Sequence, residues 1–558
     1  MQSPVAATKK SKTTTVLVFG VIIGILVVAG IVYAVLSVSS SYSKTGPGGT
    51  SNTTGASTDN GTGSCPVKIE LAAGTIEGRI TDVAGVPNTK VRAYQGVPFA
   101  QSTAGANRFK APLPISEYPN KFVDATVSRE GCTQTPSYTT ARSSAQTTED
   151  CLHLSIWSPL ACGSEARAVV VLIANEWFEE GQDPSLLDGT HMAAIADVVV
   201  VVPNHRLGPF GFLIVNDTVK NAAMYDILEA LRWVKKNIGA FGGNARRVTV
   251  VAHDAAALMT AQLLRSEYRQ LTRLSRRLVL LGMGALTRLP RNTFESTREL
   301  SKTITGGSCN TASDTAVIEC LLKSPVADIA KAVLDMKLPM RFVPVFKKSE
   351  HLLQGVQVLA GSTVNEGDVV FDAHIFPYLK KRGITDARGI VGKLLEVFVG
   401  KMDALLDLIM NHIKEEYDFD APGYRGLKDI AGNLLFICPL EKMLTNMHQS
   451  NAEVYHYILA YKPKSSKWSS PNSTSLDQLL LLSGVPFQEK NSNSDDVAMS
   501  RKLIEIVTGF AKNGTPADVG GLQWPPYGSS KSLLINVAQA QVEEKWRSDP
   551  CKEINAFT

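Results

Sequence analysis

The sequence predicts an α/β fold with a mainly parallel central sheet, preceded by one transmembrane helix. Two observations support this prediction. Strand-like and helix-like runs alternate from residue 65 to the end, and one long apolar run lies near the N-terminus. The chain has 558 residues, with 44% hydrophobic and 20% charged residues, which is ordinary for a globular protein. Its net charge of +5 is small for this length and gives no reason to expect nucleic acid as a partner.

The first element is the apolar run at 16–38, which only Ser37 interrupts. A bilayer core requires about 20 residues, whereas the apolar core of a cleaved signal peptide has about 7–15. The run is therefore predicted to be an uncleaved signal-anchor helix. Gly20 and Gly24 have the spacing that lets two membrane helices approach closely, so a homodimer is one alternative.

The charges beside this run predict its orientation. Lys9, Lys10 and Lys12 precede it, and positive flanking residues stay on the cytoplasmic side. Residues 1–15 are therefore expected to form a cytoplasmic tail. The C-terminal domain is expected to be extracellular, in a single-pass type II protein of the plasma membrane.

Residues 39–64 are rich in Ser, Thr, Gly and Asn and are predicted to form a flexible stalk. Glycosylation sequons agree with an extracellular location, and they begin at Asn52, Asn60, Asn216, Asn472 and Asn513. Eight cysteines in an outward-facing chain suggest disulfides. By position, the pairs could be Cys132 with Cys151, Cys309 with Cys320, and Cys438 with Cys551. Cys65 and Cys162 then remain, either as a fourth pair or as free or intermolecular thiols.

Residues 65–558 are predicted to form one globular domain. Apolar and β-branched runs predict its strands at 67–70, 75–79, 152–157, 168–173, 198–202, 248–251, 277–281, 356–361, 454–460 and, as the last strand, 532–536. Helical spacing of apolar residues predicts helices that include 226–238, 390–413 and 498–513. Strands that alternate with helices favour parallel pairing.

Asp254 lies at the apex of a predicted strand, turn and helix. The apolar strand ends near Val251, small residues form the turn, and the helix is expected to open at Ala257. An α/β-hydrolase carries Gly-x-Ser-x-Gly in such a turn, with the serine as nucleophile. This chain has Ala252 and Ala256 at the glycine positions and a carboxylate at the serine position.

From Val67 to Phe557 the chain resembles the type B carboxylesterase/cholinesterase family of α/β-hydrolases. The matching stretches are Tyr94–Ala100, Arg108–Lys110, Glu149–Leu152, Asn204–Leu213, Ala240–Asn244 and Trp524–Tyr527. The resemblance implies an α/β-hydrolase fold and the disulfides Cys132–Cys151, Cys309–Cys320 and Cys438–Cys551. It also implies the ion pairs Arg108–Glu149 and Arg206–Asp226.

The same resemblance implies that the catalytic positions are degenerate. Asp254 stands at the nucleophile position, Ser475 replaces the histidine base, and Glu366 matches the family's acid. His456 lies within a predicted strand and is expected to be structural. Some other α/β-hydrolases use an aspartate nucleophile, but they also need a histidine.

The oxyanion hole is also expected to be lost. The family has His-Gly-Gly-Gly-Phe where this chain has Ala174–Phe178, so the side chains of Asn175 and Glu176 replace glycines. No tryptophan that could hold a choline occurs in 133–150. No motif indicates a metal or another cofactor.

These replacements predict a catalytically inactive member of the family, similar to neurotactin and the neuroligins. Such proteins imply a role as a cell-surface adhesion molecule or protein-binding receptor, with an extracellular or cell-surface protein as partner. Two alternatives stay open: a carboxylic ester hydrolase with a rearranged site, and a protein that binds a small hydrophobic ligand.

Overall fold

The computed structural model divides the chain into two compact units, Met1–Thr62 and Gly63–Thr558. The described residues are 65–134, 147–162, 165–181, 187–214, 220–263, 271–289, 292–304, 313–336, 342–346, 355–398, 410, 422–529, 531–544, 546, 551–552 and 554–555. The tail, membrane span and stalk predicted for residues 1–64 lie outside this set. Within it, every helix is too short or too polar to cross a bilayer.

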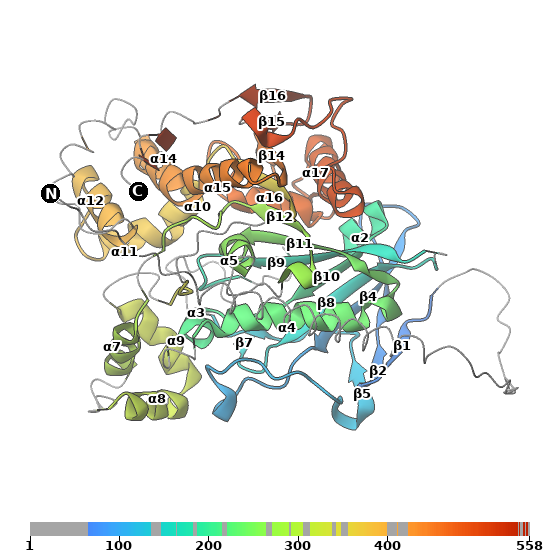
Figure 1. Cartoon of the computed structure of the whole chain (residues 1–558), viewed down its shortest axis with the longest axis horizontal. Helices are drawn as coiled ribbons and strands as arrows, with labels where there is room; N and C mark the ends of the chain where they lie inside the picture. Colours follow the sequence, from blue (N-terminus) through green and yellow to red (C-terminus); the bar gives the residue numbers. More distant parts are fainter. Residues whose placement is uncertain are drawn as a thin grey trace, which may run out of the picture. The chain divides into compact units, whose positions relative to one another are not determined.

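A mixed sheet forms the centre of the second unit (Figure 1). Its strands are β3 (Arg79–Asp82), β4 (Lys90–Pro98), β8 (His153–Pro159), β9 (Arg167–Asn175), β10 (Val199–Pro203), β11 (Gly243–Asp254), β12 (Arg277–Leu281), β13 (Gln357–Thr363), β14 (Glu453–Leu459), β15 (Lys531–Ile535) and β16 (Ala540–Glu544). They are ordered β16-β15-β14-β13-β12-β11-β9-β10-β8-β4-β3 among the described residues. Short strands pair beside it: β1 (Lys68–Leu71), β2 (Gly74–Glu77), β5 (Phe122–Asp124), β6 (Gly131–Cys132) and β7 (Thr147–Thr148).

The centre of the sheet is parallel and both edges are antiparallel. Neighbouring strands from β10 to β15 run parallel, with Val250 opposite Val171 in the β11–β9 pair. The β8–β10, β4–β8, β3–β4 and β15–β16 pairs are antiparallel. The predicted parallel sheet is therefore correct for the core strands and incomplete at the edges.

Two strands outside the parallel centre of the sheet differ from the sequence-based prediction for identifiable reasons. β4 contains Arg92, which interrupts its apolar pattern yet is buried, because its guanidinium donates to Ser158 Oγ at 2.7 Å and to the Phe241 carbonyl at 3.2 Å. β16 follows the strand predicted to be last, and it is largely exposed, so it has no apolar run to identify it. The single strand predicted at 75–79 is divided at Gly78 into β2 and β3.

Helices cover both faces of the sheet (Figure 1). They are α2 (Thr190–Ala196), α3 (Gly208–Phe212), α4 (Ala222–Asn237), α5 (Ala255–Leu263), α6 (Leu271–Leu274), α7 (Phe294–Ile304), α8 (Asp314–Lys323), α9 (Val326–Asp335), α10 (Gly367–Val370), α11 (Phe376–Lys380), α12 (Ala387–Phe398), α14 (Arg425–Gly432), α15 (Cys438–Gln449), α16 (Ser475–Leu482) and α17 (Ser494–Asn513). Side chains of a strand alternate between the faces, so Val169 and Val171 join the core under α4 and α5. Val170 and Leu172 join the core under α2, α16 and α17.

Predicted helix bounds also require correction. The helix predicted at 390–413 is α12, which begins three residues earlier at Ala387 and is described only to Phe398. The helix after the elbow begins at Ala255, directly after the strand, and not at Ala257.

The disulfides implied by the resemblance are present where the structure describes both partners. Cys132 is bonded to Cys151, and Cys438 is bonded to Cys551. Cys65 is bonded to Cys162, which resolves the alternatives left open by the sequence. Cys320 is also in a disulfide, whereas its expected partner, residue 309, lies outside the described residues.

Both implied ion pairs are present and buried. Arg108 makes two hydrogen bonds to the Glu149 carboxylate, at 2.6 and 2.7 Å. Arg206 makes the same paired contact with Asp226, at 2.8 and 2.7 Å, and both side chains are at most 3% exposed. These contacts fix the loops that lead into the site described below.

Candidate functional site

Asp254 occupies a strained turn between β11 and α5. Its φ is 54°, in the left-handed region that a residue with a Cβ rarely adopts. The side chain is 3% exposed, and the flanking Ala252 and Ala256 are fully buried. The elbow shape therefore survives without its glycines, because the strand and helix on either side determine the turn.

The loop after β9 brings a backbone donor to the same carboxylate. Trp177 and Phe178 have φ values of 52° and 66°, so they keep a glycine-like conformation despite their large side chains. The backbone N–H groups of Trp177 and Ala255 face the Asp254 carboxyl group closely enough to lower its pKa, whereas its Oδ1 has no hydrogen-bond partner among the residues that the structure describes. In α/β-hydrolases, the N–H after the nucleophile and an N–H from this loop form the oxyanion hole.

The sequence-based expectation that the oxyanion hole is lost stays a prediction. The backbone N–H groups of Trp177 and Ala255 face the carboxyl group of Asp254, which stands where the serine nucleophile would be. A substrate carbonyl would have to compete with this carboxyl group for the same N–H groups.

Asp254 also lies in a buried acidic environment. Its pKa is raised well above its ordinary value, first by burial and then by the charges of Glu176 and Glu366. The N–H groups of Trp177 and Ala255 act in the opposite direction but do not offset these effects. The geometry thus favours the neutral, protonated carboxyl group.

Trp177 fills space in front of the elbow, and sequence reasoning missed this role. It is 2% exposed and packs against Phe398 of α12 at 6.2 Å and against Phe436 of the π-helix η7 (Asn433–Ile437) at 5.8 Å between ring centroids. We call these three residues the aromatic plug. The sequence could have revealed this role, because Trp177 stands where the family has a glycine and its large side chain must fill the space that the glycine leaves open.

Asn175 serves the loop and not the reacting centre. Its Nδ2 lies 2.7 Å from Nε2 of His205, and its Oδ1 accepts from the Phe178 N–H at 3.3 Å. Because the amide nitrogen donates, Nε2 of His205 must accept, which requires the neutral imidazole. Burial lowers the pKa of His205 to about 4, in agreement with that state.

Glu366 keeps the family's acid position at the start of α10. It is 1% exposed, and one of its oxygens accepts from the Thr363 N–H at 2.6 Å. Its charge acts on Asp254, so the acid and nucleophile positions remain neighbours. Two carboxyl groups therefore lie close to each other, without the imidazole that would lie between acid and nucleophile in an active member of the family.

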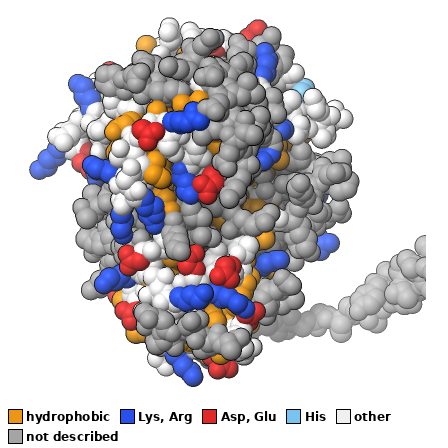
Figure 2. All heavy atoms as spheres, turned by 90° about the vertical axis from the view of Figure 1, so that its left-hand side faces the viewer, with side chains coloured by type: hydrophobic (Ala, Val, Ile, Leu, Met, Phe, Trp, Pro, Cys, Tyr) orange, Lys and Arg blue, Asp and Glu red, His pale blue; other side chains and the backbone are white. Residues whose placement is uncertain are grey.

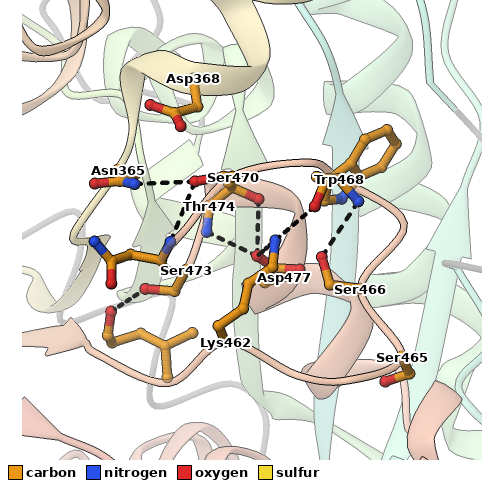
Figure 3. Close-up of polar contacts among 12 residues, drawn as sticks. Asn365, Asp368, Lys462, Ser465, Ser466, Trp468, Ser470, Ser473, Thr474 and Asp477 are labelled. Atoms are coloured by element: carbon orange, nitrogen blue, oxygen red, sulfur yellow. Dashed lines mark hydrogen bonds and ion pairs between the residues drawn. The ribbon is translucent and has the colours of Figure 1, made fainter. Parts of the chain in front are cut away.

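Ser475, at the base position, begins α16. The preceding Thr474 caps this helix with Asp477, whose carboxylate accepts from the Thr474 N–H at 2.8 Å and hydroxyl at 3.0 Å (Figure 3). Lys462 joins this network, with its Nζ 3.5 Å from the Asp477 carboxylate. The loop is thus held by capping contacts around a serine that cannot act as a base at neutral pH.

The histidines on neighbouring strands are engaged elsewhere. Nε2 of His253 lies 2.8 Å from the Ser475 carbonyl oxygen. His456, in β14, lies between Ser362 Oγ at 3.0 Å and Ser532 Oγ at 2.7 Å, and burial lowers its pKa to about 3. The structural interpretation of His456 is consistent with these contacts.

The remaining predicted sites fall into two groups. Asn472 and Asn513 are exposed, whereas the sequons at 52, 60 and 216 lie outside the described residues. In the part of the chain that the structure describes, no group of three or more His, Cys, Asp or Glu residues is arranged to hold a metal ion.

The scaffold and the positions of the site define a carboxylesterase-like protein. The model of the carboxylesterase family matches residues 65–554, so the chain belongs to this family. Three relatives are each 25% identical to the chain. Carboxylesterase 1C of Rattus norvegicus matches over 87% of the chain and 92% of its own length. Acetylcholinesterase of Bungarus fasciatus matches over 88% and 86%, and acetylcholinesterase-1 of Trittame loki over 83% and 89%.

Proposed function

We propose that this chain is a non-catalytic, cholinesterase-like protein of the cell surface that acts as an adhesion molecule or protein-binding receptor. The observation that supports this proposal most directly is the position of Asp254. Its carboxyl group takes the place of the nucleophile and lies beside the two backbone N–H groups that would stabilise an oxyanion.

Ester hydrolysis would need three parts that this site lacks. Asp254 offers no hydroxyl to attack an acyl carbon, and Ser475 cannot accept a proton as histidine does. The backbone N–H groups that would stabilise an oxyanion face the Asp254 carboxyl group instead. Loss of one such donor can lower a rate by about 100- to 1000-fold, so these changes together argue against activity.

A role in sequestering a hydrophobic ligand has less support. Such a protein would need an open apolar pocket above the elbow. The aromatic plug occupies this region, and Trp177 is almost fully buried there. Asp254, Glu176 and Glu366 would place carboxyl groups at its base.

The helices inserted after β12 and β13 are the surface that we propose for a protein partner. These helices, α7 to α12, lie on the left in Figure 1. Figure 2 shows this side, where acidic, basic and hydrophobic side chains are mixed among the described residues. Interfaces between proteins combine these groups. We therefore expect the partner to contact this face, with α8 and α12 in its rim.

The first test is ester hydrolysis by the purified full-length chain in neutral detergent. Short-chain nitrophenyl and thiocholine esters should show no turnover above buffer, and an organophosphate should not label the protein. An active esterase of known sequence serves as the control. Turnover at ordinary enzyme rates, of about 1–1000 per second, would reject the non-catalytic assignment.

The second test is binding to cell-surface proteins. Glu319 of α8 and Glu396 of α12 are exposed, so their replacement by lysine should weaken binding without unfolding the domain. Glu505→Lys, at an exposed position of α17, is the matched control. Asp254→Asn, which changes the buried elbow without removing a contact to α12, should leave binding intact. Loss of binding in that variant alone would favour the ligand-binding alternative.

A further inference from the structure

A basic pocket lies at the amino ends of the central strands β11, β12 and β13. Its volume is about 310 Å³, and its walls come from α4, β11, α6 and β12. Cationic side chains dominate the lining, and they are Lys235, Arg246, Arg247, Arg273, Arg276 and Arg277. Among the described residues that line it, none is an aspartate or glutamate.

This pocket is separate from the degenerate catalytic site. β11 begins beside the pocket and ends at Asp254. At a rise of about 3.3 Å per residue, Arg247 and Asp254 lie roughly 23 Å apart along the strand. The pocket therefore has no part in the chemistry of the elbow.

Some of these cations have structural partners. Arg277 donates to Gln357 Oε1 at 2.8 Å and to the carbonyl of Ala511 at 2.9 Å, near the C-terminus of α17. Arg247 donates to the Lys512 carbonyl at 3.1 Å, and Lys235 to the Ala245 carbonyl at 2.6 Å. These contacts satisfy hydrogen bonds but bring no negative charge, so the positive charge of the pocket remains.

The other three arginines form an exposed rim. Arg246, Arg273 and Arg276 are solvent-exposed, and their guanidinium groups make no hydrogen bond or ion pair with other residues that the structure describes. A carboxylate beside the pocket, Glu453, is already bonded to Gln357. Fifteen N–H donors would thus be available on this rim, since each guanidinium carries about five.

Mutual repulsion among these cations favours binding of an anion. The pKa of Arg277 is lowered by burial and then by Arg247, while Glu453 raises it. Like charges held together raise the local potential, and an anionic ligand relieves that cost. Guanidinium groups bind tetrahedral oxyanions through paired hydrogen bonds, which lysine cannot make.

We propose that this pocket binds a sulfated polysaccharide, with Arg246, Arg273 and Arg276 holding its sulfate groups. The biological setting rests on the cell-surface location proposed above, but the binding itself does not. Other polyanions fit the lining less well. Its described residues include no aromatic side chain on which single-stranded bases could stack. It also includes none of the exposed large hydrophobic residues among the described residues, which membrane insertion would need.

The test measures binding of the full-length protein, in neutral detergent, to immobilised heparin. The variant Arg246→Ala/Arg273→Ala/Arg276→Ala should raise the dissociation constant roughly 3- to 100-fold. It should also reduce the slope of log affinity against log salt by roughly two to three. The matched control is Arg79→Ala/Arg129→Ala/Arg501→Ala, which removes three exposed arginines elsewhere and should bind like the wild type. The unchanged thermal midpoint of both variants shows that they are folded.

Competition in solution identifies the anion. Heparin fragments should displace the protein, whereas desulfated heparin, duplex DNA and micelles that contain phosphatidylserine should compete at least tenfold less well. Equal binding by the two triple variants would overturn the proposal. So would displacement by phosphatidylserine micelles or DNA as effective as that by heparin. The proposed function is tested by esterase activity and by partner binding through α8 and α12, whereas the basic pocket is tested by heparin binding. The failure of one proposal can therefore be distinguished from the failure of the other.

Discussion

Asp254 combines two unfavourable features, a left-handed backbone and a carboxyl group in a buried acidic environment. Each feature costs on the order of 1–3 kcal/mol when the surrounding structure must enforce it. The elbow tolerates them because β11 and α5 fix the turn and because the N–H groups of Trp177 and Ala255 partly offset the acidic surroundings of the carboxyl group. This residue should therefore control how stability varies with pH.

Asp254→Asn is expected to stabilise the protein increasingly as the pH rises. A carboxyl group with a raised pKa favours the folded state below about pH 4, its ordinary unfolded pKa, and this contribution is lost as the pH rises toward the folded value. The amide keeps the shape and an acceptor oxygen but cannot ionise. Urea unfolding between pH 4 and pH 8 should show a gain of about 1–3 kcal/mol that grows with pH.

Asp518→Asn is the control for this measurement, because Asp518 is exposed. Its stability should follow that of the wild type at every pH. A constant difference between Asp254→Asn and wild type across the range would mean that Asp254 does not change its ionisation on unfolding.

Asp254→Ser should not produce an esterase. It restores a hydroxyl and vacates the backbone donors of Trp177 and Ala255, but Ser475 still cannot take a proton. We expect nitrophenyl ester hydrolysis to stay at the level of the wild type. An increase of more than about 100-fold would show that another group serves as the base.

The sequence predicted the replaced catalytic residues at this scale, because each of them falls within a family motif. It could not predict that the carboxyl group of Asp254 would face the N–H groups around it. That arrangement depends on the φ values of Trp177 and Phe178, and residue type alone predicts no left-handed conformation for an aromatic residue. The Cys65–Cys162 bond likewise required the distance between the two chain segments.

At the scale of elements, the loop after β9 links the elbow to the helices that follow β13. Trp177 leaves the loop and reaches Phe398 of α12 and Phe436 of η7. The aromatic plug thus joins three segments that are far apart in the sequence. Its removal should loosen α12 and η7 as well as the loop.

Trp177→Ala is expected to destabilise the protein by about 3–5 kcal/mol, since a large buried aromatic group is deleted. Trp177→Gly removes the same side chain but adopts the positive φ freely, so it should be about 1 kcal/mol more stable than the alanine variant. Denaturant unfolding of both variants measures the difference. Equal stabilities would show that the left-handed conformation at 177 costs nothing.

The strands of the core were predictable because each is a short apolar run between turn residues, as in β10 and β12. The edges were less predictable for the opposite reason. β16 exposes most of its side chains, and β4 buries an arginine whose partners come from β8 and from Phe241. Such partners are distant in sequence, so local patterns do not reveal them.

At the scale of the whole molecule, the two ends of the parallel strands have different roles. The carboxyl ends meet at the elbow, where the aromatic plug and Asp254 occupy the old site. The amino ends of β11 to β13 carry the basic pocket. The proposed anion-binding pocket and the Asp254 elbow therefore lie at opposite ends of the same strands, so a change at one end can leave the other end intact.

Topology can be tested on intact cells. Lys9, Lys10 and Lys12 precede the apolar run at 16–38, so a C-terminal epitope tag should be detected without permeabilisation. An N-terminal tag on the same chain is the control and should be detected only after permeabilisation. The reverse pattern, or a mature protein that begins after residue 38, would contradict the signal-anchor prediction.

The Cys65–Cys162 bond gives the domain a defined response to mechanical load. In a protein anchored through its N-terminus, tension along the stalk would enter the domain at Cys65 and pass through the disulfide to Cys162, just before the buried strand β9. The intervening segment, 97 residues in sequence separation, would carry no force. Pulling under reducing conditions should release roughly 340 Å of additional contour length, at about 3.5 Å per residue. In a chain anchored in that way, strands β1 to β8 would be shielded from tension along the stalk.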